Sequence, residues 1–160
     1  MRAGPMARTI GKSIIPLLVI DESSRALGGA LAGRTKLTKI VFLLQKLRPD
    51  LVQRIAGPGG FYAFEPFDYG PFSKELIDDL DQLRLAKLIG VTIHSLDSRG
   101  NVIEHVYSPT PEGSAAAHYS VASPADLVEI RKLVDRYAVM DRVRLVDLVH
   151  NRFPEFVRTE

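Results

Sequence analysis

The sequence predicts a mainly helical α+β protein with one small β-hairpin. An apolar stretch from Ser73 to about Leu85 has the spacing of a helix. Two short strands follow around a charged turn that contains glycine, and Thr110-Pro111 then opens another helix. This order of helix, two strands and helix is typical of a winged helix-turn-helix. We therefore expect a winged helix-turn-helix-like core with extra helices toward the C-terminus.

The composition is that of an ordinary globular protein. The 160 residues are 46% hydrophobic and 25% charged, which suits one domain with a buried core. Cysteine is absent, which excludes disulfides, thiolate nucleophiles and cysteine-based zinc sites. No apolar run approaches the ~18 residues of a membrane span, and the polar first residues lack the apolar core of a signal peptide. We expect a cytoplasmic protein without a membrane partner, with a flexible arm at residues 1–12 and a single domain at 13–160.

The first sixty residues predict two helices joined by a linker of small residues. Ile14–Asp21 is a short apolar helix, and Gly28–Gly33 is the linker. Thr35 is placed to cap the second helix, and Pro49 is placed to end it. The apolar stripe of the second helix repeats at helical spacing and consists of Leu37, Ile40, Val41, Leu44 and Leu47.

An aromatic segment separates these helices from Ser73. We expect Phe61–Glu65 to be extended, whereas Phe67–Phe72 contains Gly-Pro, which we expect to interrupt regular structure. Ser73 is a suitable N-cap, and Phe72 and Ile77 are placed to form a hydrophobic staple around it. Aromatic residues at this density usually belong to the core because they carry much burial energy.

The second half of the chain predicts the hairpin and three further helices. The strands are Val91–Leu96 and Val102–Tyr107, and Thr110 caps the helix that follows. Another helix begins at Ser123-Pro124, and a last one spans Val143–His150. The helix after Ser123 has an apolar side made of Leu127, Ile130, Val134 and Tyr137. This side either packs on the core of its own chain or joins two copies as a homodimer.

Basic residues are concentrated at the start of the chain. The net charge is only +2, but residues 1–60 hold ten Lys/Arg and three Asp/Glu. This asymmetry predicts a basic face, which serves either nucleic-acid binding or solvation alone.

DNA binding is the first functional hypothesis. In a winged helix, the helix before the hairpin usually enters the major groove and the hairpin tip contacts the backbone. Here that helix is acidic, which opposes phosphate binding. We therefore expect the DNA contacts to come from the N-terminal arm and from other positions, namely Arg34, Lys36, Lys39, Ser73, Lys74 and Arg99.

The alternative hypothesis is a protein-binding module that does not bind DNA. The acidic helix and the aromatic segment favour it, with partner contacts expected at Phe67, Tyr69, Pro71 and Phe72. The chain contains no Gly-x-Ser-x-Gly, no His-Glu-x-x-His and no carboxylate pair in a recognisable catalytic setting. We expect no enzyme activity, no cofactor and no metal: His94 and His105 are neighbours on the hairpin without a third ligand, and His118 and His150 have no partner at ligand spacing.

Several motifs resemble the SocA-like antitoxin domain, also called Panacea, and its YwgA-like winged-helix relatives. They are Gly33–Leu44 with the pattern Lys-Leu-Thr-Lys, Phe61–Glu65, Tyr69–Leu76 with its Gly-Pro, and Val146–Phe156. The segment Asp97–Gly113 is similar to the wing and following helix of MarR- and PadR-like regulators. The resemblance implies a mostly helical fold and a role as antitoxin, proteolytic adaptor or transcriptional regulator, without catalysis.

Overall fold

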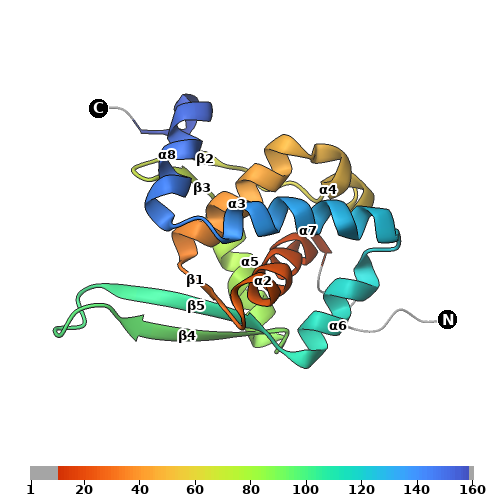
Figure 1. The fold of residues 1–160 in the computed structure, drawn as a ribbon, viewed down its shortest axis with the longest axis horizontal. Helices are drawn as coiled ribbons and strands as arrows, with labels where there is room; N and C mark the ends of the chain where they lie inside the picture. Colours follow the sequence, from red (N-terminus) through yellow and green to blue (C-terminus); the bar gives the residue numbers. More distant parts are fainter. Residues whose placement is uncertain (1–10, 159–160) are drawn as a thin grey trace.

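A computed structural model describes residues 11–158 and is mainly helical, with two small antiparallel sheets, as the α+β prediction requires (Figure 1). Its elements in chain order are η1 (Gly11–Ser13), α2 (Ile14–Leu27), β1 (Leu31–Ala32), α3 (Arg34–Leu47), α4 (Pro49–Ala56), β2 (Glu65–Phe67), β3 (Gly70–Phe72), α5 (Lys74–Leu85), β4 (Ile89–Ser95), β5 (Ile103–Pro109), α6 (Pro111–Ser120), α7 (Pro124–Ala138), α8 (Arg142–Arg152) and η2 (Pro154–Phe156). Of the expected N-terminal arm, residues 1–10 lie outside the described residues, and Gly11 and Lys12 belong to η1.

Helix α2 is the centre of the core. It is longer than predicted, and every residue from Ser13 to Ser24 is buried. It contacts α3, α5, α6, α7 and β5. The sequence placed the end of this helix at Asp21 because four polar residues follow the apolar run. The helix continues because buried Asp21 and Glu22 find partners on other helices, among them Ser114 and Arg131.

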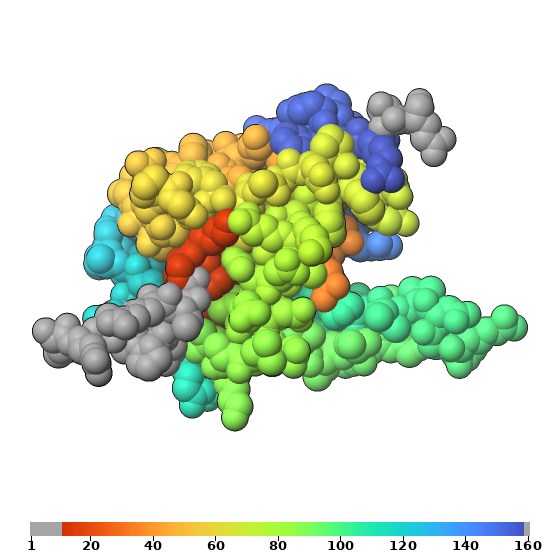
Figure 2. Space-filling view, turned by 180° about the vertical axis from the view of Figure 1, so that it is seen from behind, coloured from red at the N-terminus to blue at the C-terminus, as the bar shows by residue number. Residues whose placement is uncertain are grey.

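The larger sheet has the strand order β1-β5-β4. Strands β4 and β5 form the predicted hairpin, which projects from the helical body as a long ribbon (Figures 1 and 2). Residues expected to form part of a linker instead supply β1, in which Leu31 pairs with Tyr107 and Ala32 with Val106. Two residues are too few to show an alternating pattern, so only their pairing with β5 identifies this strand.

The start of α3 differs from the prediction. Its N-cap is Gly33, at φ 102°, and no side chain caps the first turn. Thr35, which we expected to cap this helix, lies inside it. At the other end, the helix stops at Leu47 as expected, but Pro49 also starts α4, since proline suits the first position of a helix.

The Gly-Pro segment forms a β-hairpin, which corrects the expectation that it would interrupt regular structure. We call Glu65–Phe72 the aromatic hairpin. Pro66 pairs with Pro71, and Phe67 pairs with Gly70. Gly70 adopts φ 106°, a conformation that favours glycine. The outer strand β2 is covered by the C-terminal chain, where the Arg158 backbone N–H donates to the Phe67 carbonyl at 3.1 Å.

Two predicted caps and the packing of one predicted helix are confirmed. Ser73 Oγ accepts a hydrogen bond from the Leu76 backbone N–H, and Thr110 Oγ1 accepts one from that of Gly113. The apolar side of α7 packs within its own chain, since Ile130, Val134 and Tyr137 are all buried. Among the described residues, no helix has both the length and the apolar character that crossing a bilayer requires.

Candidate functional site

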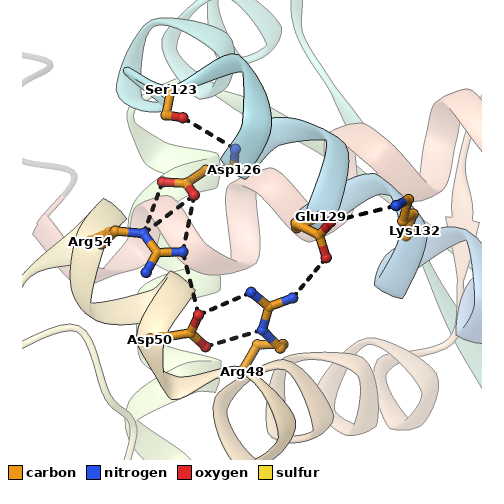
Figure 3. Close-up of polar contacts among 7 residues, drawn as sticks. All are labelled: Arg48, Asp50, Arg54, Ser123, Asp126, Glu129 and Lys132. Carbon is orange, nitrogen blue, oxygen red and sulfur yellow. Dashed lines mark hydrogen bonds and ion pairs between the residues drawn. The ribbon is translucent and has the colours of Figure 1, made fainter.

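Four of the ten cations of the N-terminal third are paired with acids from later in the chain, namely Lys12, Arg25, Arg48 and Arg54. Arg48 Nη1 lies 2.8 Å from Glu129 Oε2, and Arg54 Nη2 lies 3.0 Å from Asp126 Oδ1. Asp50 bridges the two arginines, so the cluster joins α4 to α7 (Figure 3). The hydrogen bond from Arg48 lowers the pKa of the Asp50 carboxyl to about 2. These arginines therefore stabilise a helix contact instead of forming a free basic face.

Two other cations of this region are paired in the same way. Arg25 donates to the buried carboxylate of Glu22 at 2.8 Å and to Asp135 at 3.0 Å. Lys12 forms an ion pair with Glu75 on α5. A count of charged residues does not show which cations form ion pairs in the folded protein. The count alone therefore overestimates the free positive charge of this region.

The six residues expected to contact DNA lie in very different surroundings. Lys39 is only 2% exposed and Ser73 only 1%, so neither presents a side chain on the outer surface, where a duplex backbone would contact the protein. Ser73 instead caps α5. Lys74 is exposed and lies 3.8 Å from Asp78, and Arg99 is exposed at the tip of the ribbon.

Arg34 and Lys36 are half-buried at the start of α3. Arg34 Nε donates a 3.0 Å hydrogen bond to the Tyr107 hydroxyl. Burial lowers the pKa of Lys36, and Asp141 opposes that shift. Neither residue forms part of a continuous exposed cationic stripe with Lys39.

One pocket nevertheless combines residues from both predicted sites. It lies between the start of α3 and the aromatic hairpin and has a volume of about 170 Å³. We call it the lysine pocket; it is lined by Arg34, Thr35, Thr38, Lys39, Phe67, Tyr69, Gly70, Pro71, Phe72 and Ile77. The expected partner contacts Phe67, Tyr69, Pro71 and Phe72 are all present, as are Arg34 and Lys39 from the DNA set. Pro71 is buried, whereas Phe67 is 37% and Tyr69 63% exposed.

The ammonium group of Lys39 has no hydrogen-bond or ion-pair partner among the described residues. Burial, with the charge of Arg142 as a second cause, lowers the pKa of Lys39 to about 8. His150 adds a second such group, since its Nε2 is buried without a hydrogen-bond partner in the described part of the chain. Lys39 Nζ and His150 Nε2 lie 3.4 and 3.5 Å from the point that a Cβ on Gly70 would occupy. A Cβ at this position would contact both nitrogens, and the positive φ of Gly70 itself favours glycine.

A second groove runs between α5 and the ribbon. It has a volume of about 380 Å³, and its polar lining includes Arg34, Asp81, Arg84 and His105. Burial, together with the charge of Arg34, lowers the pKa of His105. His105 pairs with Ile93, the residue before His94. Paired residues lie on the same face of a sheet, and successive residues of a strand lie on opposite faces. The two histidines that sequence places side by side therefore face opposite ways.

A third polar cluster was missed by the sequence analysis. Asp21, Glu22 and His118 each offer an atom within 4.8 Å of the others, and His118 Nε2 lies 3.0 Å from Asp21 Oδ2. Glu22 already receives hydrogen bonds from Arg25 and Arg131. Two guanidinium groups at the same carboxylate oppose a cation, so this cluster is better suited to joining α2, α6 and α7. The signal in the sequence is an acidic pair inside an apolar helix, which requires buried partners.

No family model matches this chain, and no curated protein matches it.

Proposed function

We propose that this protein is a protein-interaction module on a winged-helix-like scaffold, and that it holds its partner at the aromatic hairpin. The observation that carries the proposal is the position of exposed Phe67 and Tyr69 at the mouth of a pocket whose buried Lys39 lacks a partner in the described residues. Exposed aromatic side chains next to a pocket are typical anchors of protein interfaces.

The order of elements supports the scaffold. Helices α2, α3 and α5 precede the ribbon, and the short strand β1 between the first two joins the sheet beside β5. In this scaffold α5 takes the position of the groove-reading helix.

The surface of α5 favours a protein partner over DNA. Glu75, Asp78 and Asp81 are exposed there, and the two basic residues of the helix, Lys74 and Arg84, both lie near acidic neighbours. Phosphate attraction dominates nucleic-acid affinity, so an acidic helix lowers it. An antitoxin or a proteolytic adaptor, as the resemblance to the SocA-like domain implies, would be one form of such a module.

DNA binding is the second candidate, and the ribbon favours it. The ribbon projects from the body with Arg99 exposed at its tip (Figure 1). If DNA is the ligand, affinity for duplex DNA falls steeply with salt, and Arg99→Glu weakens it further. Binding that is absent at low salt excludes this candidate.

Site-specific photo-crosslinking tests the main proposal. A photoreactive phenylalanine analogue replaces Tyr69 in the full chain, expressed in the organism that encodes it. The matched control carries the analogue at Tyr119, which is 87% exposed on α6, away from the aromatic hairpin. We expect one discrete adduct at position 69 that is absent at position 119 and weakened by Phe67→Ser. The same adducts at both positions, or none at position 69, would contradict the proposal.

A further inference from the structure

We propose that the lysine pocket binds a carboxylate side chain, an aspartate or glutamate that the partner protein inserts between α3 and the aromatic hairpin. This inference rests on the proposed function and specifies the chemistry by which the partner is recognised. It is carried by the juxtaposition of Lys39, a buried residue whose ammonium group has no partner among the described residues, an uncapped helix start and an open aromatic wall.

The first argument is the missing counter-ion of Lys39. Lysine is almost never fully buried unless it is paired, yet Lys39 forms no ion pair or hydrogen bond with the described residues and lies in the pocket lining. Removing an ammonium group from water is unfavourable unless another group compensates it. A carboxylate entering the pocket supplies that compensation.

The second argument is the electrostatics of the pocket lining. Arg34 and Thr35 belong to the first turn of α3, which no side chain caps. The N-terminus of a helix carries a partial positive charge and favours anions. Arg142 adds a further positive charge near Lys39. The two acids of the adjoining hairpin, Glu65 and Asp68, are not part of the pocket lining, and Asp68 lies 3.4 Å from Arg158. The charges that face the pocket therefore select an anion.

The third argument is size and access. A volume of about 170 Å³ is below the ~300–1,000 Å³ usual for pockets that hold cofactors or drug-sized molecules. It accommodates one acidic side chain. The rings of Phe67 and Phe72, with centroids 5.1 Å apart, supply apolar surface for the methylene groups. Tyr69 is exposed in the pocket lining. The partner's acidic side chain would enter the pocket there, and its backbone would stay at the surface beside Tyr69.

The inference is tested first with propionate, which reproduces the end of a glutamate side chain, and with propionamide as its neutral isostere. Protein labelled with ¹³C-lysine is titrated, and the Lys39 signal is assigned by its loss in Lys39→Met. We expect propionate to shift that signal saturably, with a Kd on the order of 1–10 mM as befits a ligand of few atoms, and propionamide to leave it unchanged. Equal responses to the two compounds, or none, would overturn the inference; a stronger response to inorganic phosphate would overturn its choice of carboxylate.

A second arm uses the partner captured at Tyr69. Lys39→Met is expected to weaken partner binding at least tenfold, and Lys132→Met, at an exposed lysine on α7, is expected to leave it unchanged. Loss of binding with Tyr69→Ser but not with Lys39→Met would overturn the pocket inference while the proposed function stands. If propionate binds but no partner is captured at Tyr69, the proposed function is refuted. The occupant would then be a free small carboxylate and not a side chain of a partner protein.

Discussion

Arg34 at the start of α3 donates a 3.0 Å hydrogen bond from Nε to the hydroxyl of Tyr107 in β5. The two residues are 73 positions apart, and Tyr107 is buried where β1 and β4 both pair with β5. Arg34 also lines both the lysine pocket and the groove beside the ribbon. One contact therefore connects the ribbon with the helix that carries the proposed binding site.

Tyr107→Phe is expected to lower the free energy of unfolding by about 1–2 kcal/mol, because it removes a hydrogen bond to a charged group and leaves the ring in place. Urea denaturation measures the change. The matched control is Tyr69→Phe, whose hydroxyl is on an exposed side chain and which should leave stability unchanged. Equal effects of the two substitutions would show that the Arg34 contact contributes nothing.

Lys39→Met is expected to stabilise the protein below pH 8. The folded state holds the pKa of Lys39 at about 8, against an ordinary value of 10.5. Below pH 8 the lysine is protonated in both states, so the folded state carries the whole penalty of the buried charge, roughly 3 kcal/mol by the usual conversion. Between pH 8 and 10.5 the unfolded chain binds more protons, so the stability of the native sequence rises with pH and the difference disappears.

The measurement for Lys39→Met is thermal or urea unfolding of both proteins from pH 6 to 10.5, because groups common to both cancel in the difference. Lys74→Met, at an exposed lysine, should show no such pH-dependent difference. If Lys39→Met lowers the free energy of unfolding at pH 7, Lys39 stabilises the fold, and its charge is not an uncompensated group that a ligand would pair with.

Ser73→Ala is expected to destabilise the protein by about 1 kcal/mol, because the Leu76 backbone N–H loses its cap acceptor. Ser73→Asp should retain most of the stability, since aspartate caps helices equally well. Ser98→Ala, at an exposed position of the ribbon turn, is the control and should have no effect. Chemical denaturation compares the three variants, and an unchanged Ser73→Ala would argue against the cap.

Gly113→Ala is expected to destabilise the protein strongly, by about 3 kcal/mol or more, although alanine is the better helix former. A Cβ at position 113 would lie 1.8 Å from the Leu88 carbonyl oxygen, so α6 and the chain entering β4 would have to separate. At Gly59 a Cβ meets no atom within 4 Å, and Gly59→Ala should be tolerated. Melting temperatures of the two variants, measured by circular dichroism, test this prediction. Equal melting temperatures would exclude the close approach of residue 113 to the Leu88 carbonyl.

Most signals that act within a few residues were predicted correctly. Ser73 and Thr110 cap the helices that follow them, and the helix expected at Ser123 begins there, although Thr35 does not cap α3. The ribbon was likewise evident from alternating residues around a glycine turn. The predicted strands differ from β4 and β5 by a few residues at their ends.

The pairing of distant segments was not predictable in this way. β1 becomes a strand only because β5 lies beside it, and the Gly-Pro segment becomes a hairpin because Pro66 and Pro71 face each other across it. The place of α2 at the centre depends on partners for Asp21 and Glu22 that come from about a hundred residues away. Hydrophobic periodicity depends on residues that are close in sequence, so it cannot predict contacts between distant segments.

The sequence by itself determined the α+β fold class, the caps at Ser73 and Thr110, and the ribbon, because each follows from local backbone and side-chain chemistry. Only the tertiary structure decided which charges remain available. Arg48 and Arg54 are neutralised by α7, and Lys39, counted as part of a basic face, is buried behind the aromatic hairpin. The physical reason is that desolvation and ion pairing depend on distances between side chains, and those distances exist only after the chain has folded.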